Sequence, residues 1–318
     1  MENQDLLMLF NQELKPELES IETQRKTIKR LIGVLIAGLV LAKITYESIR
    51  NDYVAWPVAI GLALIGLVMG AKAMLKYFKY RSIFKKEVVT KIVHFINPYY
   101  VYDHKRHINA SDVIKSNLFG EKIDRCQGDD FVSGIIDKTD FQFSEIHPQY
   151  KRVTTEDGQR KTEWITIFNG LFFMADFNKH LNAETYVLPD KTEKRLGQWI
   201  RKFQKNSDFG TLVKLEDPTF ESEFKVFSSS QQEARYVLTP TMMQAIVRIR
   251  QTLKEDFRFS FIGNRVYCAV GFKKGLFEPR IRKSGVNFRD VEFMHQLFSL
   301  IELIIQEMNL NTRIWTKE

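Results

Sequence analysis

Two apolar runs near the start of the chain dominate its pattern of hydrophobic and polar positions. They cover residues 31–46 and 53–75 and are separated by a short polar segment. Because a helix rises about 1.5 Å per residue, about 20 apolar residues cross the hydrocarbon core of a bilayer. The second run has this length, and the first reaches it when Lys43 extends to the headgroups. We therefore predict a transmembrane hairpin over residues 31–75. The alternative is a pair of core helices.

Basic residues mark the outer ends of both runs. The segment between the runs has only Arg50 against Glu47 and Asp52. Lysine and arginine stay on the cytoplasmic side, so we predict an inner-membrane protein with both termini in the cytoplasm. The chain has 318 residues and a net charge of +8. Much of this excess flanks the runs, where it attracts anionic lipid, so we expect a bilayer partner and no nucleic acid.

Small residues recur at intervals of four in the second run, where Gly66 and Gly70 share one helix face. Such spacing lets two helix backbones approach closely. One interpretation is that these residues pack the two spans of one chain together. The other is a homo-oligomer formed through Gly66 and Gly70.

Helical patterns also flank the apolar runs. Residues 1–30 predict an amphipathic cytoplasmic helix, kinked or restarted at Pro16. Its apolar positions are seven apart: Leu7, Leu14, Ile21 and Ile28. Residues 76–97 predict a helical stalk that stops at Asn97 and Pro98.

Residues 98–318 predict a cytoplasmic α+β domain with mainly antiparallel strands, large enough to fold without the membrane. Strands are expected at 131–136, 141–146, 164–168, 171–177, 185–188, 212–215, 224–227, 257–262 and 266–270. Helices are expected after Asn109 or Ser111, over 192–203, from Pro240 to about Leu253, and over a long C-terminal segment, 289–308.

Three dipeptides indicate hairpin turns. Asn169 and Gly170 stand between the strands 164–168 and 171–177, and an Asn-Gly pair between apolar strands is a strong hairpin signal. Gly263 and Asn264 stand between 257–262 and 266–270, and Asp157 with Gly158 indicates a further turn.

Candidate chemistry is sparse. Two sets of residues could carry chemistry: Asp103, His104, His107 and Asp112 as metal ligands, and Asp129, Asp130, Glu145 and His147 as acid–base groups. Lys105 and Arg106 disfavour a cation in the first set, and acids at strand ends are usually solvated. Cys126 and Cys268 form no closely spaced pair. We therefore predict no catalytic, cofactor-binding or metal site.

Several segments resemble one bacterial family. They are 164–179, 185–190, 215–220 and 233–240, and they occur in the order expected for the family catalogued as domain of unknown function 3137, which is sometimes mislabelled galanin. The resemblance extends over the apolar runs and nearly all of the cytoplasmic domain. It implies a bacterial inner-membrane protein with a two-span hairpin, no activity that can be carried over, and a LemA-type membrane protein as a candidate partner.

These patterns leave three hypotheses for function. The first is a membrane-anchored scaffold or interaction module that presents its α+β domain to another membrane or cytoplasmic protein. The second is a lipid-recognising module of pleckstrin-homology-like architecture. The third is an enzyme with an unrecognised site. We expect binding and not catalysis, because no catalytic motif is present in the sequence.

Overall fold

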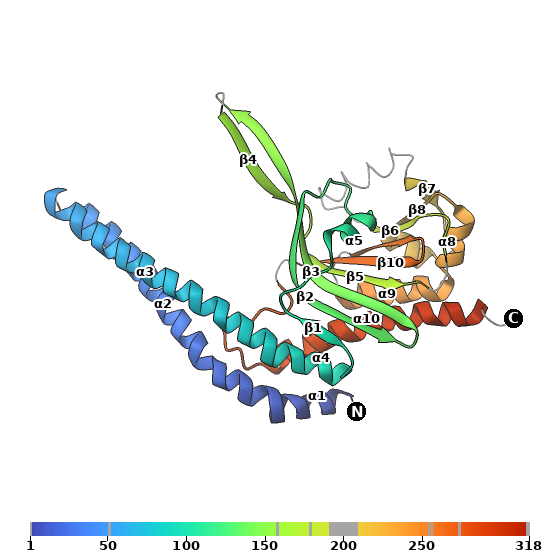
Figure 1. Ribbon diagram of the computed structural model, residues 1–318, viewed down its shortest axis with the longest axis horizontal. Helices are drawn as coiled ribbons and strands as arrows, with labels where there is room; N and C mark the ends of the chain where they lie inside the picture. Colours follow the sequence, from blue (N-terminus) through green and yellow to red (C-terminus); the bar gives the residue numbers. More distant parts are fainter. Residues whose placement is uncertain are drawn as a thin grey trace. The chain divides into compact units, whose positions relative to one another are not determined.

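The chain forms two compact units (Figure 1). The computed structural model describes residues 2–49, 52–156, 159–177, 180–190, 209–253, 255, 257–272 and 275–315. The helical unit comprises Met1–Ile96 and Phe277–His295, and the sheet unit comprises Asn97–Leu276 and Gln296–Glu318.

Two long helices dominate the helical unit. In chain order its elements are α1 (Glu2–Leu9), the π-helical turn η1 (Phe10–Leu14), α2 (Lys15–Ser48), α3 (Asp52–Phe84), the π-helical turn η2 (Lys85–Val89) and α4 (Thr90–Ile96). Helices α2 and α3 lie side by side (Figure 1). Helix α4 ends at Ile96 as predicted, because Pro98 disfavours helical backbone at the residue before it.

The turn η1 shifts the buried row of the N-terminal helix by one position. Leu14, Ile21 and Ile28 are buried as predicted, but Leu7 is exposed and Leu6 is buried in its place. A π-helical turn takes up one extra residue, so positions before it rotate relative to those after it. Pro16 is the second residue of α2, in its first turn, and the helix continues past it. The predicted limit at residue 30 therefore falls inside a continuous helix.

Glycines bring α2 and α3 into close contact. A Cβ added at Gly38 would lie 3.1 Å from the Leu62 carbonyl oxygen, and one at Gly66 would lie 3.2 Å from the Leu35 carbonyl oxygen. Gly70 faces the side chain of Leu35. The structure therefore uses this face for packing within one chain. A homo-oligomer through Gly66 and Gly70 stays a prediction.

One described helix, Tyr53–Ile96, is long and apolar enough to cross a membrane. It contains the second predicted span. Helix α2, which contains the first predicted span, is not among the described helices that meet this standard. The membrane-spanning pair is therefore not confirmed, although the two helices are.

The segment before the C-terminal helix belongs to the helical unit, which the sequence did not indicate. Glu278 receives hydrogen bonds from Arg81 and pairs with Lys85, whose Nζ lies 3.0 Å from Glu278 Oε1. Lys85 is only 1% exposed. Burial raises the pKa of Glu278, but the hydrogen bonds and charges of Arg81 and Lys85 outweigh it and hold the pKa below its usual value. Arg25 also donates to the Ile281 carbonyl oxygen.

The second unit is built on one antiparallel sheet, which confirms the sheet-rich α+β prediction. Its order is β1-β2-β3-β5-β10-β9-β6-β8-β7, and β4 pairs with β3. The strands are β1 (Val101–Asp103), β2 (Arg125–Ile136), β3 (Thr139–Glu156), β4 (Gln159–Thr166), β5 (Gly170–Asp176), β6 (Thr185–Pro189), β7 (Thr211–Val213), β8 (Phe224–Ser228), β9 (Phe257–Ile262) and β10 (Arg265–Gly271).

Helices cover the sheet on both faces (Figure 1). They are α5 (Ala110–Lys115), α7 (Pro218–Glu223), α8 (Gln231–Val237), α9 (Pro240–Leu253) and α10 (Phe288–Trp315). The rings of Phe143 on β3 and Phe298 on α10 lie 5.3 Å apart. On the other face, Phe172 and Met174 pack with Val113 of α5 in a buried cluster. The predicted long C-terminal helix is therefore a cover for the sheet.

Asn169 and Gly170 do not form the predicted hairpin. Strands β4 and β5 both pair with the same edge of β3, one after the other, so the chain keeps its direction between them. Gly170 has φ +154°, and a Cβ there would lie 2.1 Å from the Val270 carbonyl oxygen. Asn169 donates from its side chain to the Phe272 carbonyl oxygen at 3.1 Å. Asn169 and Gly170 therefore form a junction between β4 and β5, which follow one another along the same edge of β3. Their contacts hold this junction against the end of β10.

The other local predictions have mixed outcomes. The β9–β10 hairpin at Gly263 and the start of α9 at Pro240 are confirmed. Strand β1 and the short helices α7 and α8 were not predicted. The turn at Asp157 and Gly158 and the helix expected over 192–203 lie outside the described residues.

We predict that Glu278→Gln destabilises the protein by about 3 kcal/mol at neutral pH, because it leaves a buried lysine without its charge partner. Folding lowers the pKa of Glu278, so its ionised carboxylate stabilises the folded protein fully at pH values above the pKa of the unfolded carboxyl. This stabilisation is lost as the pH falls through the lower pKa of the folded state. The difference in free energy of unfolding between the variant and the unsubstituted chain should therefore vanish in acid. Thermal unfolding in detergent across pH measures this, with Glu163→Gln on an exposed strand position as the control.

We predict that Gly170→Ala lowers the free energy of unfolding by about 3 kcal/mol or more. The new methyl group would clash with the Val270 carbonyl oxygen, and L-residues rarely adopt the φ angle of Gly170. Gly263→Ala is the matched comparison. Gly263 also has positive φ, but nothing lies within 4 Å of an added Cβ, so it should cost only about 1 kcal/mol. Equal midpoints of thermal unfolding for the two variants would contradict the junction role of Gly170.

Candidate functional site

A bulge between β2 and β3 brings together acidic residues of the second predicted set. Asp129 lies opposite Glu145, and the register then shifts so that Asp130 and Phe131 oppose Ser144 alone. Asp130 has φ +56°, a left-handed backbone that one bulge type requires and that aspartate tolerates better than most residues. The side-chain oxygens of Asp129, Asp130 and Glu145 lie within 4.8 Å of one another.

Neighbouring groups hold these carboxylates. Asp130 is fully buried, and its Oδ1 accepts a 2.5 Å hydrogen bond from the Tyr102 hydroxyl of β1. Glu145 Oε2 accepts one from the Leu276 backbone N–H at 3.1 Å. Carboxylate oxygens are the ligands that hard cations such as Ca²⁺ prefer. The same contacts also fasten β1 and the segment after β10 to the bulge, which is a structural role.

The first predicted set does not assemble. The loop after β1 is tied down at Ile108, whose N–H donates to the buried Ser144 hydroxyl at 3.0 Å. His107 Nδ1 donates to the Ile108 carbonyl oxygen at 2.7 Å. Arg106 lies 4.6 Å above the Phe131 ring. Asp103, His104, His107 and Asp112 do not form a ligand group within reach of one ion, whereas Asp129, Asp130 and Glu145 do.

His147 is part of a structural network and not of the acidic group. Its Nδ1 lies 3.1 Å from Asn169 Oδ1, and its Nε2 lies 3.1 Å from both the Gln149 amide and the Thr166 hydroxyl. These contacts join β3 to the junction between β4 and β5. His147 therefore helps to fix the point where β4 leaves the main sheet.

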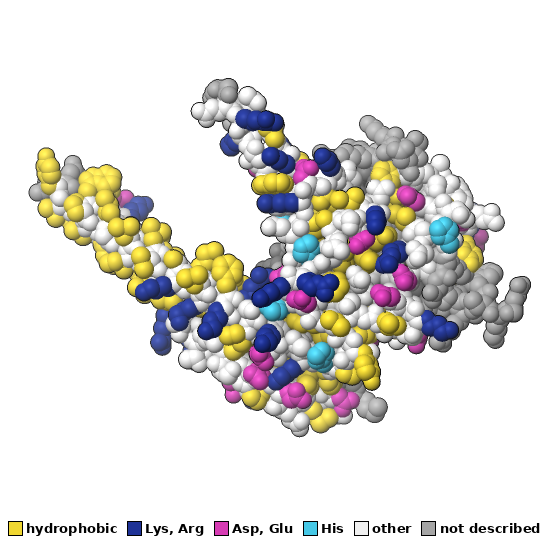
Figure 2. Space-filling model, in the orientation of Figure 1, with side chains coloured by type: hydrophobic (Ala, Val, Ile, Leu, Met, Phe, Trp, Pro, Cys, Tyr) yellow, Lys and Arg dark blue, Asp and Glu magenta, His cyan; other side chains and the backbone are white. Residues whose placement is uncertain are grey.

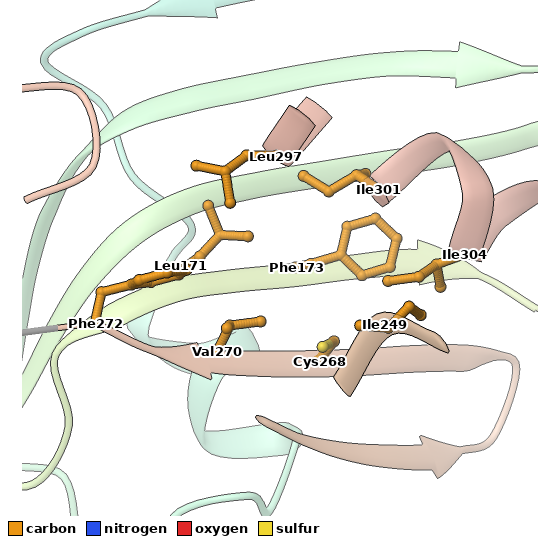
Figure 3. Close-up of a pocket in the computed structure, with 9 residues that line it drawn as sticks. All are labelled: Leu171, Phe173, Ile249, Cys268, Val270, Phe272, Leu297, Ile301 and Ile304. Carbon is orange, nitrogen blue, oxygen red and sulfur yellow. The ribbon is translucent and has the colours of Figure 1, made fainter. Parts of the chain in front are cut away.

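A small apolar cavity lies between the sheet and the helices that cover it (Figure 3). Its lining comes from β5, β10, the residue after β10, α9 and α10: Leu171, Phe173, Ile249, Cys268, Val270, Phe272, Leu297, Ile301 and Ile304. The free volume of about 10 Å³ is at the limit for a single water molecule. Burial raises the pKa of the Cys268 thiol. The cavity offers neither space for a substrate nor an activated nucleophile.

Burial also raises the pKa of Cys126 to about 11, although a backbone hydrogen bond from His147 opposes it. The thiolate is the reactive form of cysteine, so this side chain is unreactive at neutral pH.

An exposed ribbon is formed by β4 and the second half of β3 (residues 149–166) and is called here the β3–β4 ribbon. It extends away from the rest of the sheet (Figure 1). Residues 151–155 and 159–164 are all exposed, and β4 pairs with β3 alone. Figure 2 shows Lys and Arg side chains gathered along it.

Opposed residues in an antiparallel pair share one face, so the register assigns each ribbon side chain to a face. One face carries Lys151 opposite Trp164, Val153 opposite Thr162, and Thr155 opposite Arg160. Arg125 of β2 stacks 4.0 Å above the Trp164 ring on the same face. None of the described residues on this face is acidic. The other face carries Arg152 and Lys161 together with Glu163.

The sequence alone does not single out this face. Lys151, Val153 and Thr155 stand at every second position, as residues on one face of a strand do. Segment 147–156 was not predicted as a strand, however, so no strand was expected to pair with it. A polar strand is recognisable only once its opposite strand is known.

Comparisons with known proteins give a family and a distant structural likeness. No curated protein matches the sequence. Among solved structures, the crystal structure of the mycobacterial trehalose monomycolate transport factor A, TtfA, is similar over 63% of this chain and 88% of that chain, with 10% sequence identity and a TM-score of 0.31. A score this low supports no argument about fold or function.

The family comparison tests the resemblance noted in the sequence. It confirms that resemblance over the stretch that contains β5, β10 and most of α10. Residues 166–310 match the family described as protein of unknown function DUF3137.

Proposed function

We propose that the protein is a membrane-anchored interaction module. In this proposal α2 and α3 cross the bacterial inner membrane as a hairpin and hold the sheet unit at the cytoplasmic surface. The observation that carries the proposal is a continuous band of exposed apolar side chains around the paired helices.

Most apolar side chains of this band point away from the contact between α2 and α3. The exposed members are Val34, Ile36, Leu39, Val40, Leu41 and Ile44 on α2, and Val54, Trp56, Val58, Ile60, Leu64, Ile65, Leu67, Val68, Met74 and Leu75 on α3. Soluble proteins rarely expose contiguous apolar patches larger than a few hundred Å². Hydrocarbon chains of lipid would cover such a band, which supports a second span in α2.

Basic residues at the open ends of the hairpin support the orientation. Lys26, Lys29 and Arg30 precede the apolar part of α2, and Lys72, Lys76 and Lys79 follow that of α3. The positive-inside rule places these ends in the cytoplasm. At the closed end, the rings of Tyr46 and Trp56 are in edge contact at 5.0 Å, and such aromatic side chains suit the opposite interface.

The sheet unit is the part that would meet a partner. Its acidic group is bound into the bulge and its cavity is closed, whereas its ribbon is open to solvent on both faces. This contrast favours binding over catalysis. The partner class is another membrane or cytoplasmic protein, with a LemA-type protein as the first candidate from the family resemblance. The enzyme alternative would rest on Asp129, Asp130 and Glu145.

We predict that Leu64→Lys combined with Ile65→Lys abolishes membrane insertion. Both side chains are more than half exposed at the centre of the apolar stretch, where each lysine costs about 3 kcal/mol. The control is Leu75→Lys with Phe78→Lys, which places the same charges among existing lysines. Resistance of the protein to alkaline carbonate extraction measures insertion. A central double variant that stays as resistant as the control would contradict the anchor.

We predict that a reporter active only in the cytoplasm functions when fused after Glu318, and that a reporter active only outside does not. The basic flanks are the physical reason. Fusions at residue 51, between the two helices, should show the reverse pattern. Cytoplasmic activity at both positions would mean that the hairpin does not cross the bilayer.

Co-purification tests the interaction itself. The tagged chain is co-expressed with a LemA-type protein, extracted in mild detergent and isolated, with the Leu64→Lys, Ile65→Lys double variant as the unanchored comparison. Stoichiometric recovery with the anchored chain is expected. If the chain purifies alone while Asp129→Asn abolishes its cellular role without loss of stability, the enzyme hypothesis replaces this one.

A further inference from the structure

We propose that one face of the β3–β4 ribbon binds the anionic surface of a lipid bilayer. The face consists of Lys151, Val153, Thr155, Arg160, Thr162 and Trp164 and is called here the basic face. This inference rests on the proposed membrane anchor, because the anchor keeps the sheet unit close to lipid.

The composition of the basic face matches a membrane interface. Trp164 and Val153 lie diagonally across the ribbon, and each is 39% exposed. Tryptophan prefers the headgroup region, where its ring contacts apolar chains and its N–H stays hydrated. Lys151 lies opposite Trp164, and Arg160 is two pairs further along, so a positive charge stands on each side of the apolar pair.

Charge separates the two faces of the ribbon. The basic face carries Lys151 and Arg160, with Arg125 at its base, and none of the six residues that define it is acidic. Beside it, the Asp124 carboxylate accepts a hydrogen bond from the Lys151 backbone N–H at 2.8 Å. On the opposite face, Arg152 lies directly across from Glu163 and donates to the Tyr150 hydroxyl at 3.2 Å. An anionic surface would therefore attract the basic face more strongly than the other.

Arg125 fixes the orientation of the Trp164 ring in the absence of lipid. Its guanidinium stacks on the indole at 4.0 Å and also donates through Nε to Gln149 Oε1 at 2.6 Å. These two contacts restrict the tryptophan ring before any partner binds, so less side-chain entropy is lost on binding. A flat stacked ring beside lysine suits lipid headgroups. Nucleic acid is the competing occupant, since bases also stack on aromatic rings.

The test uses the full chain with Cys126→Ser, reconstituted in nanodiscs of phosphatidylcholine alone or mixed with phosphatidylglycerol. An environment-sensitive fluorophore is attached to Thr162→Cys on the basic face or, as the matched control, to Thr154→Cys on the other face. Both threonines are exposed and lie on the same ribbon. Co-elution with the nanodisc reports anchoring separately from the fluorophore signal.

We expect a blue shift for the label at 162 with phosphatidylglycerol present, little shift with phosphatidylcholine alone, and little shift at 154. The shift should weaken as salt is raised, because salt screens exposed charges. Lys151→Gln with Arg160→Gln should lower the equilibrium constant for contact about 30-fold, since each basic residue near an anionic surface contributes a factor of about five. Arg152→Gln with Lys161→Gln should change it much less.

Val153→Asn is a second variant that alters no charge, and it should also weaken contact. Unfolding midpoints equal to that of the parent chain confirm that the variants are folded. Equal shifts at 154 and 162, or no shift at either, would overturn the proposal. So would a shift at 162 produced by an added oligonucleotide and not by phosphatidylglycerol. A chain that elutes apart from the nanodisc would overturn the anchor, on which this inference rests.

Discussion

The sheet unit depends on strand β3, which runs over Thr139–Glu156 and pairs along both edges. At about 3.3 Å per residue it is about 60 Å long, far beyond an average strand. Its first half holds β2 on one edge and β5 on the other, and its second half continues beyond the sheet with β4. Because β3 continues without a break, the exposed ribbon extends the hydrogen-bonded pairing of the core sheet.

Side chains along β3 change character where the strand leaves the core. Phe141 and Phe143 pack inside the unit, whereas Val153 and its neighbours lie in solvent. Between them, His147 and Gln149 hydrogen-bond to Asn169 and Thr166, at the junction of β4 and β5. Polar contacts thus mark the limit between the buried and the exposed parts of one strand.

In the helical unit, buried charged side chains join segments that lie far apart in the sequence. Lys85 is almost fully buried and meets Glu278, which arrives from a segment far along the chain. Arg25 likewise hydrogen-bonds to Glu22 and to the backbone at Ile281. Buried ion pairs gain little over apolar packing but are costly to break, so they select one arrangement of the chain. The segment before α10 therefore has a defined place on the helices.

The sequence by itself determined the features that follow from local periodicity: the apolar helices, the β9–β10 hairpin, the antiparallel α+β class and the long C-terminal helix. It did not determine how the other strands pair. Asn169 and Gly170 have a hairpin signature, yet β5 continues along β3, because long-range ladders with β3 and β10 outweigh the local turn preference. The sequence grouped Asp129, Asp130, Glu145 and His147, but only the bulge and the register decided that Asp130 joins Asp129 and Glu145 while His147 stays apart. The basic face needed the tertiary structure, because only the pairing of β3 with β4 placed Trp164 beside Lys151.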